Sequence, residues 1–171
     1  MLTDIINIKI NPNLPLLICD ADEVIFEFMT TFESFLNSNN LYFSYQSFKL
    51  NGNIKEIKNN KALESSKISL LIDNFFKKHT YTQKLVKGCK ITLEELSKHI
   101  SIIILTNMPN EYVINRIKAL ENNGMFYDVI VNKGGKGQVC AELEKKTDNS
   151  VFFIDDSPNQ IASVAYKTKN I

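Results

Sequence analysis

Three short apolar runs, each ended by polar or acidic side chains, limit the folds open to this chain more than any other feature. The runs are Leu14 to Cys19 before Asp20, Ile102 to Leu105 before Thr106, and Val151 to Ile154 before Asp155. A weaker run covers Val129 to Val131. Continuous apolar runs of this length are typical of strands buried on both faces, as in a parallel sheet covered by helices.

Helical patterns lie between these runs in the second half of the chain. Val113, Ile117 and Leu120 recur at i, i+4 and i+7, with Pro109 near the start of the segment and Gly124 after its end. This spacing, with a proline near the start and a glycine after the end, predicts an amphipathic helix. Because strand and helix alternate, we expect an α/β fold with a doubly wound parallel sheet and right-handed crossovers.

The first half of the chain breaks this alternation. About 80 residues separate the first apolar run from the second, which is far more than one crossover helix requires. We therefore predict an α/β core formed by residues 1–25 and 87–171, with a small helical segment, residues 26–86, inserted after the first strand. Within the insertion we expect helices at about Glu27 to Leu36 and Lys61 to Lys78.

Composition excludes several classes of protein. With 171 residues, 44% of them hydrophobic, the chain is expected to form one soluble globular domain that carries a small insertion. A net charge of +1 provides no field that would draw the whole molecule onto a nucleic acid or an anionic membrane. Arg116 is the only arginine, which further disfavours a nucleic-acid reader that depends on bidentate arginine contacts.

The cysteines and the start of the chain favour a cytoplasmic protein. Cys19, Cys89 and Cys140 are odd in number and far apart in sequence, so neither a disulfide framework nor a zinc site is indicated. The apolar stretch near the middle of the chain is too short to span a bilayer. The first residues have an early acid and no basic region before an apolar stretch. We therefore do not expect a secretory signal there.

Chemically active side chains follow each predicted strand. They are Asp20 and Asp22, then Thr106 and Asn107, then Lys133 and Lys136, then Asp155 and Asp156. Since ligands of open parallel sheets bind outside the carboxyl ends of the strands, we expect these side chains to meet there. Four carboxylates at one edge would repel one another and raise their own pKa values unless a cation neutralised them. Oxygen ligands without His or Cys favour a hard ion, and Mg²⁺ is usual where phosphate also binds.

The order of these residues resembles the haloacid dehalogenase superfamily of phosphatases and phosphotransferases. Its four motifs are matched by LPLLICDADEV, by SIIILTN, by the region from Lys133 to Lys136, and by VFFIDDS, in the order that the superfamily uses. The resemblance covers about Leu14 to Phe26 and Gly88 to Ala165 and stops in the inserted segment. It implies a Rossmann-like core, with the insertion acting as a cap over a small substrate.

The resemblance also implies a role for each motif residue. Asp20 would be the nucleophile that forms an aspartyl-phosphate, and Asp22 would protonate the leaving oxygen and then deprotonate the attacking water. Thr106 and the backbone amide of Asn107 would bind the phosphoryl group. A lysine would balance charge on the nucleophile and the phosphate. Asp155 and Asp156, one of them through water, would hold Mg²⁺ together with Asp20 and the carbonyl of Asp22.

Two candidates remain for the motif lysine. Lys136 lies in GGKGQ just before a predicted helix, where the superfamily's lysine usually lies, and Lys133 is the alternative. The surrounding glycines do not form a Walker loop, because Ile130 and Gly137 occupy the positions that need Gly and Ser or Thr.

The resulting hypothesis is a Mg²⁺-dependent phosphatase of a small phosphorylated metabolite, such as a nucleotide or a sugar or organic-acid phosphate. The alternative is a catalytically silent module that binds phosphate or metal or serves regulation. A protein phosphatase is disfavoured because Val24 replaces the Thr of capless relatives and because the insertion would obstruct a polypeptide. The order of the acids argues against a phosphorylatable receiver.

Residues 26–86 have a net charge of +3, from eight Lys and five acids, so a basic cap is expected over an acidic site.

Overall fold

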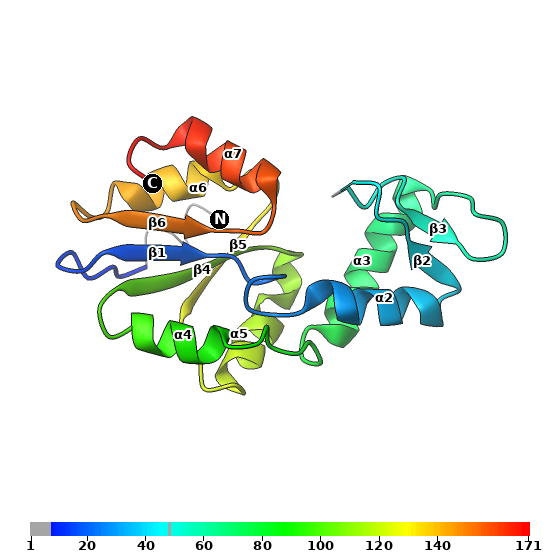
Figure 1. Cartoon of the computed structure of the whole chain (residues 1–171), viewed down its shortest axis with the longest axis horizontal. Helices are drawn as coiled ribbons and strands as arrows, with labels where there is room; N and C mark the ends of the chain where they lie inside the picture. The colour runs from blue at the N-terminus through cyan, green and yellow to red at the C-terminus, as the bar shows by residue number, and fades with distance from the viewer. Residues whose placement is uncertain (1–7, 48) are drawn as a thin grey trace.

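In the part of the chain that the structure describes, four parallel strands form a sheet beside a smaller lobe. The computed structural model describes residues 8–47 and 49–171, so the first seven residues of the predicted core lie outside the described part. The strands are β1 (Leu16–Cys19), β4 (Ser101–Asn107), β5 (Asp128–Asn132) and β6 (Val151–Ile154), in the spatial order β5-β4-β1-β6 (Figure 1). All neighbouring pairs are parallel. The three apolar runs and the weaker fourth run therefore form the predicted strands.

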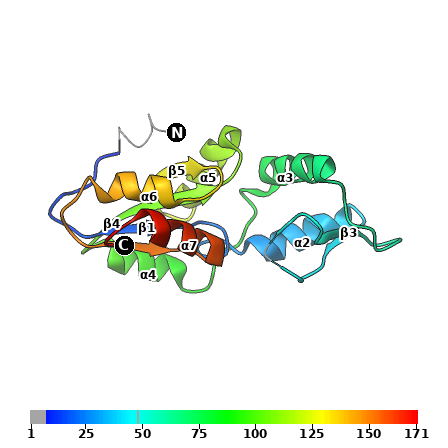
Figure 2. The same cartoon turned by 90° about the horizontal axis from the view of Figure 1, so that it is seen from above.

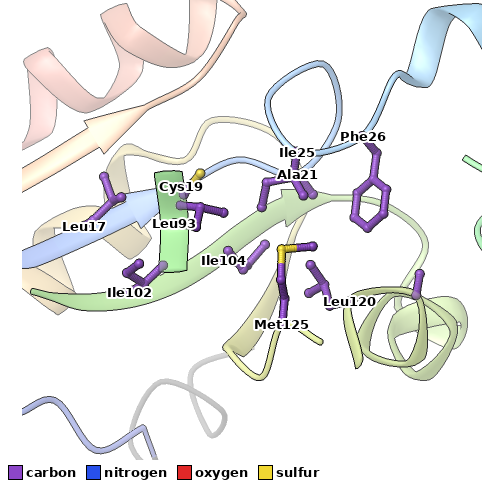
Figure 3. Packing of buried hydrophobic residues seen from close by; sticks show 11 residues of the cluster. Leu17, Cys19, Ala21, Ile25, Phe26, Leu93, Ile102, Ile104, Leu120 and Met125 are labelled. Atoms are coloured by element: carbon purple, nitrogen blue, oxygen red, sulfur yellow. The ribbon is translucent and has the colours of Figure 1, made fainter. Parts of the chain in front are cut away.

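Helices cover both faces of the sheet, which confirms the doubly wound architecture. Helices α6 (Gly137–Glu144) and α7 (Pro158–Lys167) lie on one face, and α4 (Cys89–Leu96) and α5 (Val113–Glu121) lie on the other (Figure 1). Alternate residues of β1 serve the two faces: Leu16 and Ile18 belong to the cluster under α6 and α7. Leu17 and Cys19 belong to the cluster under α4 and α5, which Figure 3 shows.

One face of β6 is not buried, so the expectation of burial on both faces is wrong for this strand. Phe152 is 53% exposed and Ile154 is 46% exposed. They pair in register with Leu17 and Cys19 and thus point to the face that α4 and α5 cover elsewhere. The apolar cluster under α4 and α5 includes residues of β1 and β4 but none of β6. The edge strand therefore extends past the helices that cover its neighbours.

The inserted segment, which we call the cap (residues 26–86), contains a hairpin as well as two helices. Its elements are α2 (Phe28–Ser38), β2 (Leu41–Phe43), β3 (Ile54–Glu56) and α3 (Ser65–His79). Strands β2 and β3 pair antiparallel. The two predicted helices of the insertion are present, and the short hairpin between them was not predicted. Asn40, with φ 58°, turns the chain sharply after α2, and the buried side chains of Leu41 and Ile54 then join the cap's apolar cluster.

The cap lies at the end of the core rather than over a face of the sheet (Figure 2). Its two connecting segments run side by side, because the Glu27 N–H donates to the Lys84 carbonyl at 2.8 Å and the Val86 N–H donates to the Ile25 carbonyl at 2.9 Å. The cap has an apolar cluster of its own, in which Phe32 and Phe75 are fully buried. Met108, which follows β4, joins that cluster and so connects it to the core.

A close approach of two helices fixes the start of α6. A Cβ atom added at Gly137 would overlap the backbone carbonyl of Ser163 in α7. The Gly137 N–H donates to the Ser163 hydroxyl at 3.1 Å, and the Lys136 N–H donates to the Gln160 side chain at 2.9 Å. Glycine is therefore required at position 137 by packing against α7, and this contact sets the place of Lys136.

We expect Gly137→Ala to destabilise the protein. The steric overlap costs about 1–3 kcal/mol, which exceeds the roughly 1 kcal/mol that alanine gains over glycine inside a helix. Gly135→Ala is the matched control, because its Cβ would meet only the movable Ser163 side chain. Urea denaturation of both variants measures the free energies of unfolding. Equal stabilities would show that α6 and α7 can separate without cost, contrary to this account.

Candidate active site

Three carboxylates meet where β1 and β6 end. Asp20 follows β1, Asp155 and Asp156 follow β6, and one oxygen from each lies within 4.8 Å of the other two. The Asp20 N–H donates to the carbonyl of Ile154 at 2.9 Å, so the pairing of the strands continues into the site. The sheet thus gathers residues that are more than 130 positions apart in sequence.

A buried lysine lies between two of these carboxylates. Lys136, at the start of α6, is only 1% exposed. Its Nζ atom lies 2.6 Å from Asp20 Oδ1 and 2.6 Å from Asp155 Oδ2. Lys133, by contrast, is exposed and lines a separate hollow together with Asn107 and Met108. Of the two candidate lysines, the structure brings Lys136 to the acids.

The two acids after β6 have different surroundings. Both oxygens of Asp155 accept hydrogen bonds, one from Lys136 and the other from the Ser157 N–H at 2.9 Å. Among the described residues, no other residue donates to the Asp156 side chain, which lines a cavity facing the cap. Asp156 is therefore free to contact a ligand or metal, whereas Asp155 is held by its neighbours.

Burial is the main influence on the charge of Asp20. It raises the pKa of this carboxyl to about 7, while Lys136 opposes that rise and the carboxylates of Asp22 and Asp155 add to it. Burial and the neighbouring Asp155 also raise the pKa of Asp156. Repulsion between acids, which the sequence suggested as the cause, is therefore secondary to desolvation.

The residues at the carboxyl ends of β4 and β5 form the next part of the site. Thr106 is fully buried, and its hydroxyl has no hydrogen-bond partner among the described residues. The Asn107 side chain donates to the Gly134 carbonyl at 2.8 Å and accepts from the Asn132 side chain at 2.9 Å. Asn107 thus ties the end of β4 to the loop before Lys136, and Thr106 retains a free hydroxyl.

Asp22 makes an ion pair that the sequence did not reveal. The Nη2 atom of Arg116 lies 2.6 Å from Asp22 Oδ1, and Nη1 donates to the Gln83 side chain at 2.8 Å. Arg116 is completely buried, and its guanidinium lies 4.6 Å from the centre of the Phe26 ring. Gln83, near the end of the cap, also donates to Asp22 Oδ1 at 3.5 Å. Asp22 is therefore held from both the core and the cap.

Arg116 could have been identified from its position in the sequence. It lies three residues after Val113 and four before Leu120, on the apolar stripe of the predicted helix. A charged residue on such a stripe is buried and requires a partner. Its partner, Asp22, is 94 positions away. The pairing itself therefore depends on the fold.

We expect the stability of the metal-free protein to fall as pH rises from about 4 to 7. The pKa of Asp20 in the folded state is about 7 and its ordinary value is 3.8, so the folded protein binds more protons in this window than the unfolded chain. Each pKa unit corresponds to about 1.4 kcal/mol. Asp20→Asn should flatten the pH dependence.

Urea denaturation with a chelator present, repeated across this pH range, measures the free energy of unfolding. The same slope in wild type and Asp20→Asn would contradict the assignment of the shift to Asp20.

Comparisons with known proteins identify a family and a fold for the chain. A family model described as NLI interacting factor-like phosphatase matches residues 15–170. No curated protein sequence matches the chain. Within the described residues, no helix is both long enough and apolar enough to cross a bilayer.

Solved structures of haloacid dehalogenase-type hydrolases share the fold. One from Streptococcus pneumoniae has a TM-score of 0.60 at 16% identity, covering 90% of this chain and 80% of its own. One from Geobacter sulfurreducens has a TM-score of 0.55 at 13% identity, covering 90% and 83%. A magnesium-bound protein from Bacillus subtilis, described as a hydrolase of this type, has a TM-score of 0.55 at 12% identity, covering 92% and 84%.

At these identities the likeness concerns the fold alone, whereas the family match extends over nearly the whole chain and includes every strand of the sheet. The acids and the lysine that the fold brings together are the ones that the four sequence motifs contain. The chain therefore belongs to the NLI interacting factor-like phosphatases, which are hydrolases of the haloacid dehalogenase type.

Proposed function

We propose that the protein is a Mg²⁺-dependent phosphatase that hydrolyses a small phosphorylated metabolite through an aspartyl-phosphate on Asp20. The observation that carries this proposal is the cluster of Asp20, Lys136 and Asp155 beside Asp156 at the carboxyl edge of the sheet. The family description names a phosphatase and no substrate. The cytoplasmic setting predicted from the sequence belongs to the same proposal.

The donor set fits a magnesium ion. Asp20, Asp155 and Asp156 offer carboxylate oxygens that lie close together, and hard ions of this kind prefer such ligands. Because Asp155 is already held by Lys136 and Ser157, we assign direct contact to Asp20, Asp156 and the main-chain carbonyl of Asp22, with Asp155 acting through Lys136 or water. When bound, the ion would supply charge neutralisation between the nucleophile and the phosphate. Magnesium in the Bacillus subtilis structure supports this choice.

In the proposed reaction Asp20 and Asp22 act in the roles that the family resemblance implies. A carboxylate oxygen of Asp20 attacks the phosphorus atom, and the bond from phosphorus to the leaving oxygen breaks while Asp22 donates a proton to that oxygen. Water then attacks the phosphorus atom of the aspartyl-phosphate and gives its proton to Asp22. The bond between phosphorus and the Asp20 oxygen breaks, which releases phosphate and restores both acids.

Three further residues prepare these steps. Lys136 opposes the effect of burial on Asp20 and so favours the anion that acts as nucleophile. The free hydroxyl of Thr106 is available to donate to a phosphoryl oxygen. Arg116 is a positioning residue: it binds one oxygen of Asp22 and so fixes the direction of the other. Lys133 lies outside this group and could contact only a more distant part of a substrate.

Hydrolysis of acetyl phosphate and a panel of phosphate monoesters tests the proposal directly. We expect wild-type activity to require Mg²⁺, because the buried acids need a compensating cation. We also expect Asp20→Asn to lower kcat by at least about 10³-fold, since the amide cannot act as the nucleophile. Phosphate release is the measurement.

Lys133→Ala, an exposed position outside the acid cluster, is the matched control. Activity that persists in Asp20→Asn would exclude the nucleophile. A wild-type protein that binds Mg²⁺ but hydrolyses none of the panel would favour the silent-module alternative.

The role of Arg116 predicts a dependence on the leaving group. A benzyl alcohol leaving group needs a proton from Asp22, whereas p-nitrophenolate is stable as an anion and does not. We expect Asp22→Asn to lower kcat on benzyl phosphate by roughly 10²-fold or more, with a much smaller loss on p-nitrophenyl phosphate. Arg116→Lys and Arg116→Met should also lower kcat more on benzyl phosphate than on p-nitrophenyl phosphate, but by smaller factors than Asp22→Asn does.

Urea denaturation of the Arg116 variants separates this role from a loss of folding, because removing one member of a buried ion pair costs about 3–5 kcal/mol. If the folded Arg116 variants lose kcat equally on both substrates, Arg116 has a structural role only.

A further inference from the structure

A cavity of about 610 Å³ opens between the core and the cap on the side of Asp22. Its core wall carries the carboxylates of Asp22, Glu23 and Asp156, and its cap wall includes the apolar side chains of Phe28, Phe43 and Leu50. This volume lies in the range of small-molecule sites. Because Asp22 and Asp156 line it, the cavity adjoins the proposed reacting centre directly.

We propose that this cavity binds the leaving group of the substrate, and that this group is flat, apolar and without a second anionic charge. The inference rests on the proposed phosphatase function and names its substrate class. The leaving oxygen must lie beside Asp22 to receive its proton. Asp22 lines this cavity, whereas the hollow beside Lys133 includes neither Asp22 nor Asp156 among its described residues.

The apolar wall is held in place by contacts within the cap. The Phe28 ring stacks on Phe32 at 5.2 Å between centroids and meets Phe75 edge-on at 5.0 Å. Phe43 meets Tyr45 edge-on at 5.0 Å, and the Tyr45 hydroxyl donates to Glu33 at 2.6 Å. Tyr45 also lines the cavity and is 68% exposed as a residue. A flat apolar group would cover aromatic surface that is otherwise exposed to water.

The charges around the cavity oppose a second anion. Glu23 is fixed there because its Oε1 atom accepts a hydrogen bond from the Met29 N–H at 2.5 Å. None of the described residues that line the cavity is basic. The cap has a net charge of +3, but Lys58 and Lys67 line a different hollow, beside β3 and α3. The expected basic cap over the site is therefore wrong for the wall that faces Asp22.

Benzyl phosphate and 4-carboxybenzyl phosphate test the inference as a matched pair, since they differ by one carboxylate. In wild type with Mg²⁺, we expect kcat/KM to be at least roughly tenfold higher for benzyl phosphate. Glu23→Gln removes the charge and retains an oxygen for the Met29 N–H, so it should bring the two values closer together. Phe43→Ala should lower the ratio of kcat/KM for benzyl phosphate to kcat/KM for acetyl phosphate, mainly by raising KM for the benzyl ester.

Leu70→Ala is the control, because Leu70 is exposed and lines the separate hollow that contains Lys58. It should leave unchanged the kcat/KM for benzyl phosphate relative to that for 4-carboxybenzyl phosphate and relative to that for acetyl phosphate. If wild type hydrolyses acetyl phosphate but does not prefer benzyl over 4-carboxybenzyl phosphate, the inference is overturned and the proposed function stands. If it hydrolyses none of these three compounds with Mg²⁺ present, both are overturned.

Discussion

The contact on which the site depends is the buried ammonium group of Lys136 between Asp20 and Asp155. Three ionisable groups are taken out of water there, and such burial is unfavourable unless each charge has a partner at close range. Lys136 supplies that partner to two acids at once. The requirement extends into the fold, because the position of Lys136 depends on the start of α6, and α6 can approach α7 only with glycine at position 137.

A second ion pair separates the roles of the four acids. Arg116 pairs with Asp22, and Asp155 is held by Lys136 and Ser157, which leaves Asp156 without a side-chain partner among the described residues. Four carboxylates of the same type thus have different surroundings. In the proposed reaction Asp20 would be the nucleophile, Asp22 lines the cavity, Asp155 anchors the lysine, and Asp156 is open to a ligand.

The surface that the cap presents to the acids depends on which of its side chains face them and not on its net charge. Its lysines are numerous, yet those that line hollows do so away from Asp22, while aromatic and aliphatic residues form the wall that faces the acids. Gln83 connects the cap to the Arg116 and Asp22 pair, so any movement of the cap relative to the core would act on Asp22. The inserted segment is therefore coupled to the site by hydrogen bonding as well as by position.

The sequence by itself determined the strands, the doubly wound sheet and the family, because buried parallel strands require continuous apolar runs and the motif residues follow them directly. It did not determine the hairpin in the cap or the exposed face of β6, since three-residue strands have too few side chains for a periodic pattern and the reach of α4 and α5 is set by packing. Only the tertiary structure paired Arg116 with Asp22 and showed that Lys136, which the resemblance already favoured over Lys133, contacts the acids. Those contacts depend on distances between residues far apart in the chain, and local side-chain patterns contain no information about such distances.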